Sequence, residues 1–244
     1  DDIAEFPSSK SSPVYCKQLI NWEMDLMKQA DIVLCSSEYL KEKVISRSGI
    51  NREVHIINNA ISLPQIRHFD SFPSKVQDAI NLLKSLKCSL LYIGTISQWF
   101  DFKLICEALD KKEDVQLVLI GPKDCDIPSH KQIHYIGSVE RQYIYSLMEQ
   151  ASALVMPFIV NELIRSVNPV KMYEYIYMEK PIIAPHYGEM EKFLPYINLY
   201  HDNDEFMSLV DQLSKSELQI SSEKGNEMKG FAEKNTWEKI LFNV

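Results

Sequence analysis

The sequence predicts an α/β fold, a Rossmann-like parallel sheet with helices on both faces. Apolar runs of strand length alternate with amphipathic helical segments, and several of the runs end in glycine. The runs are apolar throughout, which is typical of parallel strands covered on both faces. With 244 residues, the chain is long enough to bury one large core or two small ones.

In the first 59 residues the pattern is strand–helix–strand after a helical lead. A polar, proline-containing segment over 1–12 precedes a helical pattern over 13–30. The order that follows is a strand at 32–35, a helix from a Ser37 cap to Gly49, and a strand at 54–57. Residues 60–73 contain two prolines and no clean period, which predicts a connector, and residues 74–86 are predicted to be a helix.

From residue 88 the pattern becomes regular, with helices predicted at 101–109 and 139–151 and a helical tail from 202. Six strands are expected, at 88–94, 115–121, 133–137, 153–158, 181–185 and 197–200. Three of them end in Gly94, Gly121 and Gly137, at the edge where open parallel sheets bind ligands. A single glycine there more often just turns the chain, but three together with a nearby helix start indicate one crevice.

The stretch 168–181 is the best candidate for a binding element. Asn168 is predicted to cap a helix whose first position is Pro169. This helix is apolar almost all round, but Lys171 and Glu174, three residues apart, share one face. The two charges either satisfy each other or point at solvent, or Lys171 faces an anion at the helix start and Glu174 accepts a hydrogen bond from a sugar hydroxyl.

Composition and motifs argue against several other classes. The net charge of −8 leaves no excess of basic residues for general nucleic-acid binding. No apolar run approaches the roughly 20 residues of a membrane-spanning helix, and no signal peptide, G-x-G-x-x-G or P-loop motif is present. The five scattered cysteines favour free thiols in a cytoplasmic protein over a metal site. The start at Asp1 indicates an excised piece of a longer protein.

Four runs in order resemble the donor-binding half of GT-B-fold glycosyltransferases, above all a bacterial group that includes cell-surface polysaccharide enzymes. They are YIGTISQWFDFKLICEAL, VQLVLIGP, IHYIGSVERQYIYSLMEQASALVMPF and NPVKMYEYIYMEKPIIAP. The resemblance also covers DDIAEFP, ADIVLCSSEYLKEKV, VHIINNAI and FAEKNTWEKI. It implies four parts: a remnant of the N-terminal, acceptor-side domain (1–59), a connector and linker helix (60–87), a nucleotide-sugar donor-binding domain (88–234) and a C-terminal crossover helix (235–244).

The resemblance implies a metal-independent glycosyltransferase without a cofactor, which moves a sugar from a nucleotide-sugar donor to an acceptor hydroxyl in cell-surface polysaccharide or glycolipid synthesis. The expected partners are the donor, a glycan or lipid-linked acceptor and the missing N-terminal domain, with peripheral association at the inner face of the plasma membrane. The alternatives are a nucleotide-sugar epimerase on the same fold and a non-catalytic nucleotide-sugar-binding subunit. The base, sugar, acceptor, stereochemistry, oligomeric state and activity of this chain alone stay open.

Matched by position, Glu174 corresponds to the glutamate that holds the donor ribose in this family. Ser166 stands where many retaining members carry a second glutamate, and Glu162 is the nearest acid. The first glycine loop lacks the family's basic residues, so Lys171, Arg165 or Lys123 could supply the charge, and no catalytic residue is assigned. The expected donor-binding residues are Gly94, Thr95, Lys123, Gly137, Ser138, Val139, Arg141, Asn161, Asn168, Pro169, Lys171 and Glu174.

Overall fold

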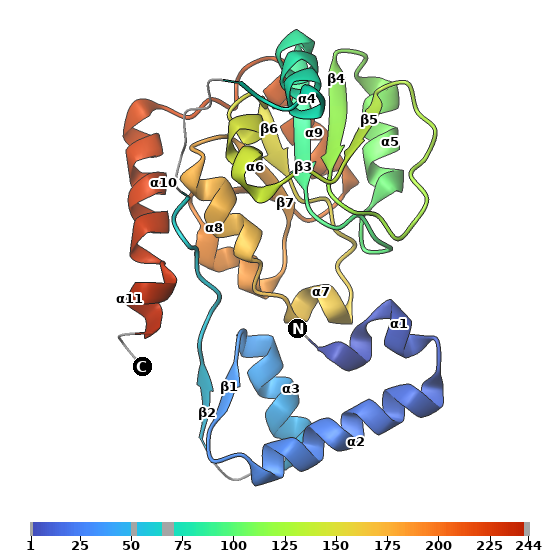
Figure 1. The fold of residues 1–244 in the computed structure, drawn as a ribbon, viewed down its shortest axis with the longest axis vertical. Helices are drawn as coiled ribbons and strands as arrows, with labels where there is room; N and C mark the ends of the chain where they lie inside the picture. Colours follow the sequence, from blue (N-terminus) through green and yellow to red (C-terminus); the bar gives the residue numbers. More distant parts are fainter. Residues whose placement is uncertain (1, 50–52, 65–70, 242–244) are drawn as a thin grey trace.

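A computed structural model describes residues 2–49, 53–64 and 71–241, which form a large α/β unit and a smaller N-terminal unit (Figure 1). In the large unit six parallel strands lie in the order β5-β4-β3-β6-β7-β8. Counted along the chain this is 3-2-1-4-5-6, the order of doubly wound dinucleotide-binding sheets. The predicted fold class and the six predicted strands are therefore confirmed.

The elements of the large unit follow the sequence pattern closely. The strands are β3 (Cys88–Ile93), β4 (Val115–Ile120), β5 (Ile133–Gly137), β6 (Ala153–Val155), β7 (Ile182–Pro185) and β8 (Asn198–Tyr200). The helices are α4 (Ser74–Ser85), α5 (Phe102–Lys111), α6 (Arg141–Met148), the short α7 (Glu162–Ser166), α8 (Val170–Tyr177), the 3-10 helix η2 (Gly188–Phe193), α9 (Asn203–Ser214), α10 (Ser222–Lys234) and α11 (Trp237–Leu241). In Figure 1, α4, α6 and α8 cover one side of the sheet and α5 and α9 the other.

The core of the large unit lies on both sides of its central strands. All six residues of β3 are buried, which agrees with a strand covered on both faces. Val76, Ile80 and Leu83 of α4 join the same core, so this helix packs on the large sheet. The part of the predicted connector at 65–70 lies outside the described residues.

The N-terminal unit is small and has a core of its own. It comprises η1 (Ile3–Glu5), α1 (Pro7–Lys10), α2 (Pro13–Gln29), β1 (Val33–Cys35), α3 (Glu38–Ser48) and β2 (Val54–Ile56), with β1 and β2 paired in parallel. Five residues make up its buried cluster: Met27, Val33, Cys35, Val44 and Val54. A cluster this small stabilises little by itself, so contacts with the large unit must help to hold this one.

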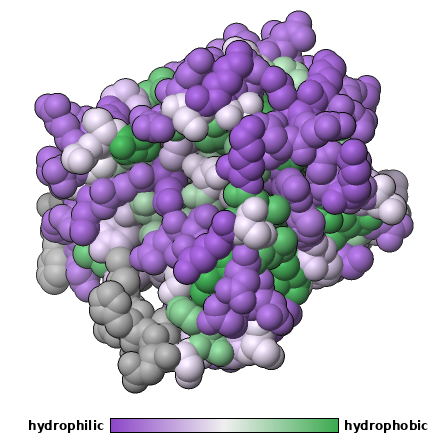
Figure 2. Space-filling model, turned by 90° about the horizontal axis from the view of Figure 1, so that it is seen from above, coloured by the Kyte–Doolittle hydropathy of each residue, from purple (hydrophilic) through white to green (hydrophobic). Residues whose placement is uncertain are grey.

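The face of the large unit opposite the N-terminal unit is mostly polar (Figure 2). Seen from above, on the side away from the N-terminal unit, the molecule is mostly hydrophilic, with hydrophobic side chains showing between the polar ones (Figure 2). Within the ranges that the structure describes, no helix combines the length and apolar character needed to cross a membrane.

Candidate functional site

Three glycines lie side by side at the carboxyl edge of the large sheet. Gly94, Gly121 and Gly137 follow or end the neighbouring strands β3, β4 and β5, and all have positive φ angles (154°, 138° and 81°). The Gly94 N–H donates to the Ile120 carbonyl (2.8 Å) and the Gly121 N–H to the Gly137 carbonyl (3.1 Å). Backbone without side chains therefore lines this edge, where a ligand can approach closely.

The reversal of strand order falls between β3 and β6. Chains leaving these two neighbouring strands diverge to opposite faces, which opens the crevice where doubly wound sheets bind ligands. A pocket of about 200 Å³ lies there, lined by Thr95 and Trp99 after β3, Phe158 after β6 and Lys171 of α8. The geometry thus brings the predicted residues Thr95 and Lys171 to one crevice.

Lys171 is a half-buried cation without a hydrogen-bond or ion-pair partner among the described residues. A Cβ built on Gly94 would lie 2.3 Å from the Lys171 Cε and 2.7 Å from its Nζ, so the glycine leaves the space that this side chain fills. The ammonium makes no hydrogen bond or ion pair with any residue in the described part of the chain. Burial lowers the pKa of Lys171, and the nearby Glu174 only partly opposes this shift. An anionic ligand would supply the missing partner.

Glu174 has partners of its own, and they come from α6. Its Oε1 accepts hydrogen bonds from Arg141 Nη2 (2.8 Å) and from the Tyr145 hydroxyl (3.3 Å). Burial raises the pKa of Tyr145 to about 12, so its hydroxyl stays protonated and able to donate. The alternative that Lys171 and Glu174 satisfy each other is therefore not what the structure shows. The sequence pattern did not predict a role for Tyr145, although this residue lies four positions after Arg141 and therefore on the same face of α6.

Asn168 does not cap α8, which corrects the prediction. The helix begins at Val170, Pro169 occupies the cap position, and no side chain caps it. The Asn168 Oδ1 instead accepts the Asn59 N–H (2.9 Å), and its carbonyl accepts the Asn59 Nδ2 (2.6 Å). Asn168 is 1% exposed because the N-terminal unit packs over it, so it ties the two units together and does not face solvent.

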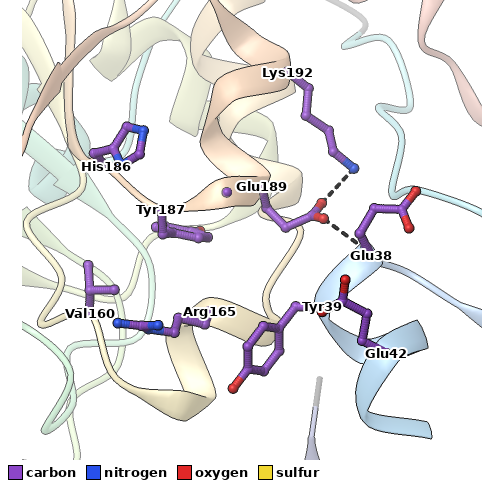
Figure 3. Close-up of a pocket in the computed structure, with 10 residues that line it drawn as sticks. Glu38, Tyr39, Glu42, Val160, Arg165, His186, Tyr187, Glu189 and Lys192 are labelled. Carbon is purple, nitrogen blue, oxygen red and sulfur yellow. Dashed lines mark hydrogen bonds and ion pairs between the residues drawn. The ribbon is translucent and has the colours of Figure 1, made fainter. Parts of the chain in front are cut away.

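Glu189 makes a second tie between the units, in the pocket of about 490 Å³ drawn in Figure 3. Its carboxylate, 3% exposed, reaches from η2 to the start of α3, where it accepts the Glu38 N–H (2.9 Å). It also accepts from Asn168 Nδ2 (3.0 Å) and pairs with Lys192 Nζ (2.6 Å). A carboxylate at a helix N-terminus satisfies free N–H groups and the helix dipole. No local sequence signal marks this role.

Asn168→Ala is expected to destabilise the protein by about 2–4 kcal/mol. The change leaves the Asn59 N–H without its acceptor and removes one of three donors to the buried Glu189 carboxylate, and each unsatisfied buried group costs about 1–3 kcal/mol. Urea-induced unfolding measures the loss. Asn161→Ala, which removes the side-chain cap of α7, is the matched control and should cost only about 1 kcal/mol. Equal losses of stability in the two variants would contradict the proposed role of Asn168 in holding the two units together.

Ser166, which stands where the family resemblance expects a second glutamate in retaining enzymes, has a structural role in this chain. The Ser166 hydroxyl, fully buried, donates to the Leu163 carbonyl (2.6 Å) and accepts the Asp2 N–H (3.3 Å). Glu162, the nearest acid, contacts the Tyr39 hydroxyl and lies 3.7 Å from Lys43. Both residues therefore serve the contact between the units.

Lys123 and Ser138, two further predicted residues, follow β4 and β5 at the same sheet edge. Lys123 is stacked over the Tyr135 ring (5.4 Å), and the Ser138 carbonyl accepts a hydrogen bond from Lys75 (2.8 Å). Arg165 lines the pocket of Figure 3 with Tyr39 and Tyr187. This pocket is separate from the pocket beside Lys171, which other residues of α7 line. In the described ranges, no group of three or more His, Cys, Asp or Glu side chains is placed to hold a metal ion.

Comparison with known proteins connects this geometry to a fold family. No family model matches the chain. It is 25% identical over 219 residues to TuaH of Bacillus subtilis (strain 168), which is named as a teichuronic acid biosynthesis glycosyltransferase. The match covers 85% of this chain and 53% of TuaH, so the chain spans about half the length of the curated relative it matches.

Solved structures share the arrangement at lower identity. Anabaena HepE, crystallised with UDP and glucose, is 14% identical with a TM-score of 0.68, over 95% of this chain and 66% of HepE. The chain has the fold of the GT-B glycosyltransferases. Sucrose-phosphate synthase from Thermosynechococcus elongatus gives the same GT-B match, with a TM-score of 0.69 and 15% identity over 93% of this chain and 60% of that one.

Proposed function

We propose that this chain is the donor-binding part of a GT-B glycosyltransferase, which moves a sugar from a nucleotide sugar to an acceptor hydroxyl. The observation that carries the proposal is the pair formed by Lys171 and Glu174 on α8, at the strand-order reversal of the sheet. Lys171 is a cation that forms no ion pair with the described residues, and Glu174 is a carboxylate about one helical turn away. That spacing suits a diphosphate beside Lys171 and a ribose beside Glu174.

In this proposal the protein stabilises the negative charge that develops on the departing diphosphate. Lys171 and the free amides at the start of α8 supply the positive charge, so the reaction requires neither a metal nor a cofactor. The glycine edge of Gly94 and Thr95 lies along the phosphates, and Gly137, Ser138, Val139 and Arg141 border the nucleoside. Asn168 and Pro169, both buried, directly precede α8 and hold its first residues in place.

The acceptor in this proposal is a glycan or a lipid-linked sugar used for a cell-surface polymer or glycolipid. The name of TuaH, which refers to teichuronic acid biosynthesis, supports a cell-surface glycan. We propose that the reaction takes place in the cytoplasm, at the inner face of the plasma membrane, and that a larger N-terminal domain provides the acceptor platform.

Calorimetry with nucleoside diphosphates and their sugars tests this function. The chain should bind UDP, dTDP or GDP, and sugar release from the bound donor should require the acceptor. Conversion of the free nucleotide sugar into an epimer would instead favour the epimerase. Donor binding without transfer, in a protein that carries the full N-terminal domain, would favour the non-catalytic subunit. If the chain binds none of the three diphosphates, all three hypotheses (transferase, epimerase and non-catalytic binding subunit) are wrong.

Glu174→Ala is expected to weaken binding of a nucleoside diphosphate by roughly 10- to 100-fold, because a buried ribose hydroxyl loses its acceptor at a cost of about 1–3 kcal/mol. The loss should nearly vanish for a 2′,3′-dideoxynucleoside diphosphate, which lacks those hydroxyls. Glu107→Ala on α5, the opposite face of the sheet, is the control and should leave affinity unchanged. A loss as large for the dideoxy ligand would show that Glu174 acts on the fold and not on the ribose.

A further inference from the structure

The side chains that line the pocket beside Lys171 are mostly apolar. The volume of this pocket, about 200 Å³, is comparable with a single sugar ring. Six of the side chains that line it are aromatic or aliphatic, and their only polar atom is the indole nitrogen of the tryptophan. They are Phe6, Trp99, Phe158, Leu163, Ile164 and Val167.

Few hydrogen-bonding groups border this pocket. The Tyr92 hydroxyl already donates to the Thr95 carbonyl (2.8 Å), so its proton is in use. Lys171 stands at the mouth toward Gly94, where a diphosphate would engage it. The Thr95 side chain remains, and it is exposed at the rim. Among the described residues, no carboxylate or amide side chain lines the pocket, although such groups commonly fix sugar hydroxyls.

The pocket lies where the donor's sugar would extend. Glu174 and Lys171 are three residues apart on one helix face, about 4.5 Å along the axis. A ribose at the first and a diphosphate at the second define a direction toward the start of α8. The same Lys171 is shared by the diphosphate position and the apolar pocket, and the N-terminal unit closes the far side with Phe6.

We propose that this pocket receives the sugar of the donor and selects a 6-deoxyhexose, which presents a methyl group where an ordinary hexose presents a hydroxymethyl group. The inference rests on the proposed function and specifies its substrate class. A hydroxyl at C6 that is turned against the aromatic and aliphatic walls would lose its water partners without a replacement, whereas a methyl group would pack on those walls. The ring hydroxyls, which both kinds of sugar share, would lie toward Lys171 and the exposed Thr95. Discrimination by such pockets is typically about 10- to 100-fold.

Competition calorimetry with matched donor pairs tests the inference. Each pair shares its nucleotide and differs only at C6 of the sugar: UDP-glucose with UDP-6-deoxyglucose, dTDP-glucose with dTDP-6-deoxyglucose, and GDP-mannose with GDP-6-deoxymannose. For whichever diphosphate the chain binds, the 6-deoxy member should bind at least about 10-fold tighter. Equal binding, or tighter binding of the parent hexose, would overturn the inference and leave the proposed function standing. Failure of all three bare diphosphates to bind would overturn both.

Val167→Thr adds a hydroxyl to the pocket wall with little change of shape. The variant should reduce the preference for the 6-deoxy sugar several-fold, because the hydroxymethyl group gains a hydrogen-bond partner. Val14→Thr makes the same change on the exposed start of α2 and should leave the preference as it is. An unchanged preference in Val167→Thr, with an intact thermal unfolding transition, would overturn the assignment of this pocket to the sugar.

Discussion

Lys171→Met should bind a nucleoside diphosphate roughly 100-fold more weakly than the parent chain, and yet unfold at a higher temperature. The affinity falls because the diphosphate loses its charged partner, and a close charge pair in a dehydrated site is typically worth about 2–5 kcal/mol. The stability rises because the ligand-free protein no longer buries an ammonium that forms no hydrogen bond or ion pair with the described residues. Opposite changes in stability and affinity are typical of a residue kept for binding.

The stability gain of Lys171→Met should depend on pH in a defined direction. Burial lowers the pKa of Lys171 below its ordinary value of 10.5. Below the lowered pKa the ammonium is charged in both states, so folding carries the full cost of burying it. Between the lowered pKa and 10.5 the unfolded chain binds more protons, and stability therefore rises with pH. The difference in melting temperature between variant and parent should shrink across that window and disappear above it.

Two controls make the experiment specific. Lys103→Met removes a lysine whose side chain is 85% exposed on α5, and it should change neither the affinity nor the melting temperature appreciably. Lys123→Met tests a second cation at the sheet edge. If Lys123→Met lost affinity and Lys171→Met did not, the phosphate site would lie over the loop after β4, and the assignment of Lys171 would be wrong.

Gly121→Ala should destabilise the fold by about 3 kcal/mol or more, which corresponds to a fall of roughly 6–12 °C in melting temperature. The backbone at Gly121 has a φ of 138°, a conformation that favours glycine. A Cβ there would lie 2.1 Å from the Gly94 carbonyl oxygen, which belongs to backbone held by the neighbouring strand. Relief would require one of two central strands to move.

Gly230→Ala is the matched control for this clash. Gly230 lies within α10, and apart from its chain neighbours and its own helix backbone no atom of the described residues lies within 4 Å of a built Cβ. Alanine should therefore stabilise the helix by about 0.5–1 kcal/mol. Thermal unfolding of both variants by circular dichroism measures the two effects. A melting temperature of Gly121→Ala within a degree or two of the parent would show that the glycine edge is not as closely packed as described.

The local sequence pattern predicted most of the large sheet, because the periodicity and the turn residues that mark its strands and helices lie within a few residues of one another. The six apolar runs became six parallel strands, and the glycines that end three of them mark the edge of the crevice. The spacing of Lys171 and Glu174 correctly placed them on one face of α8. The cap assigned to Asn168 was wrong, since its hydrogen bonds go to a residue 109 positions away.

By itself, the sequence determined the six strands of the α/β sheet, the glycine edge and the helix face that carries the candidate site, because periodicity and turn chemistry act over neighbouring residues. Only the tertiary structure decided that Arg141 and Tyr145 hold Glu174, that Glu189 accepts the first N–H of α3, and that aromatic side chains from both units enclose the pocket beside Lys171. These contacts join segments far apart in the chain. They depend on how the two units pack, and packing leaves no periodic signal in either segment.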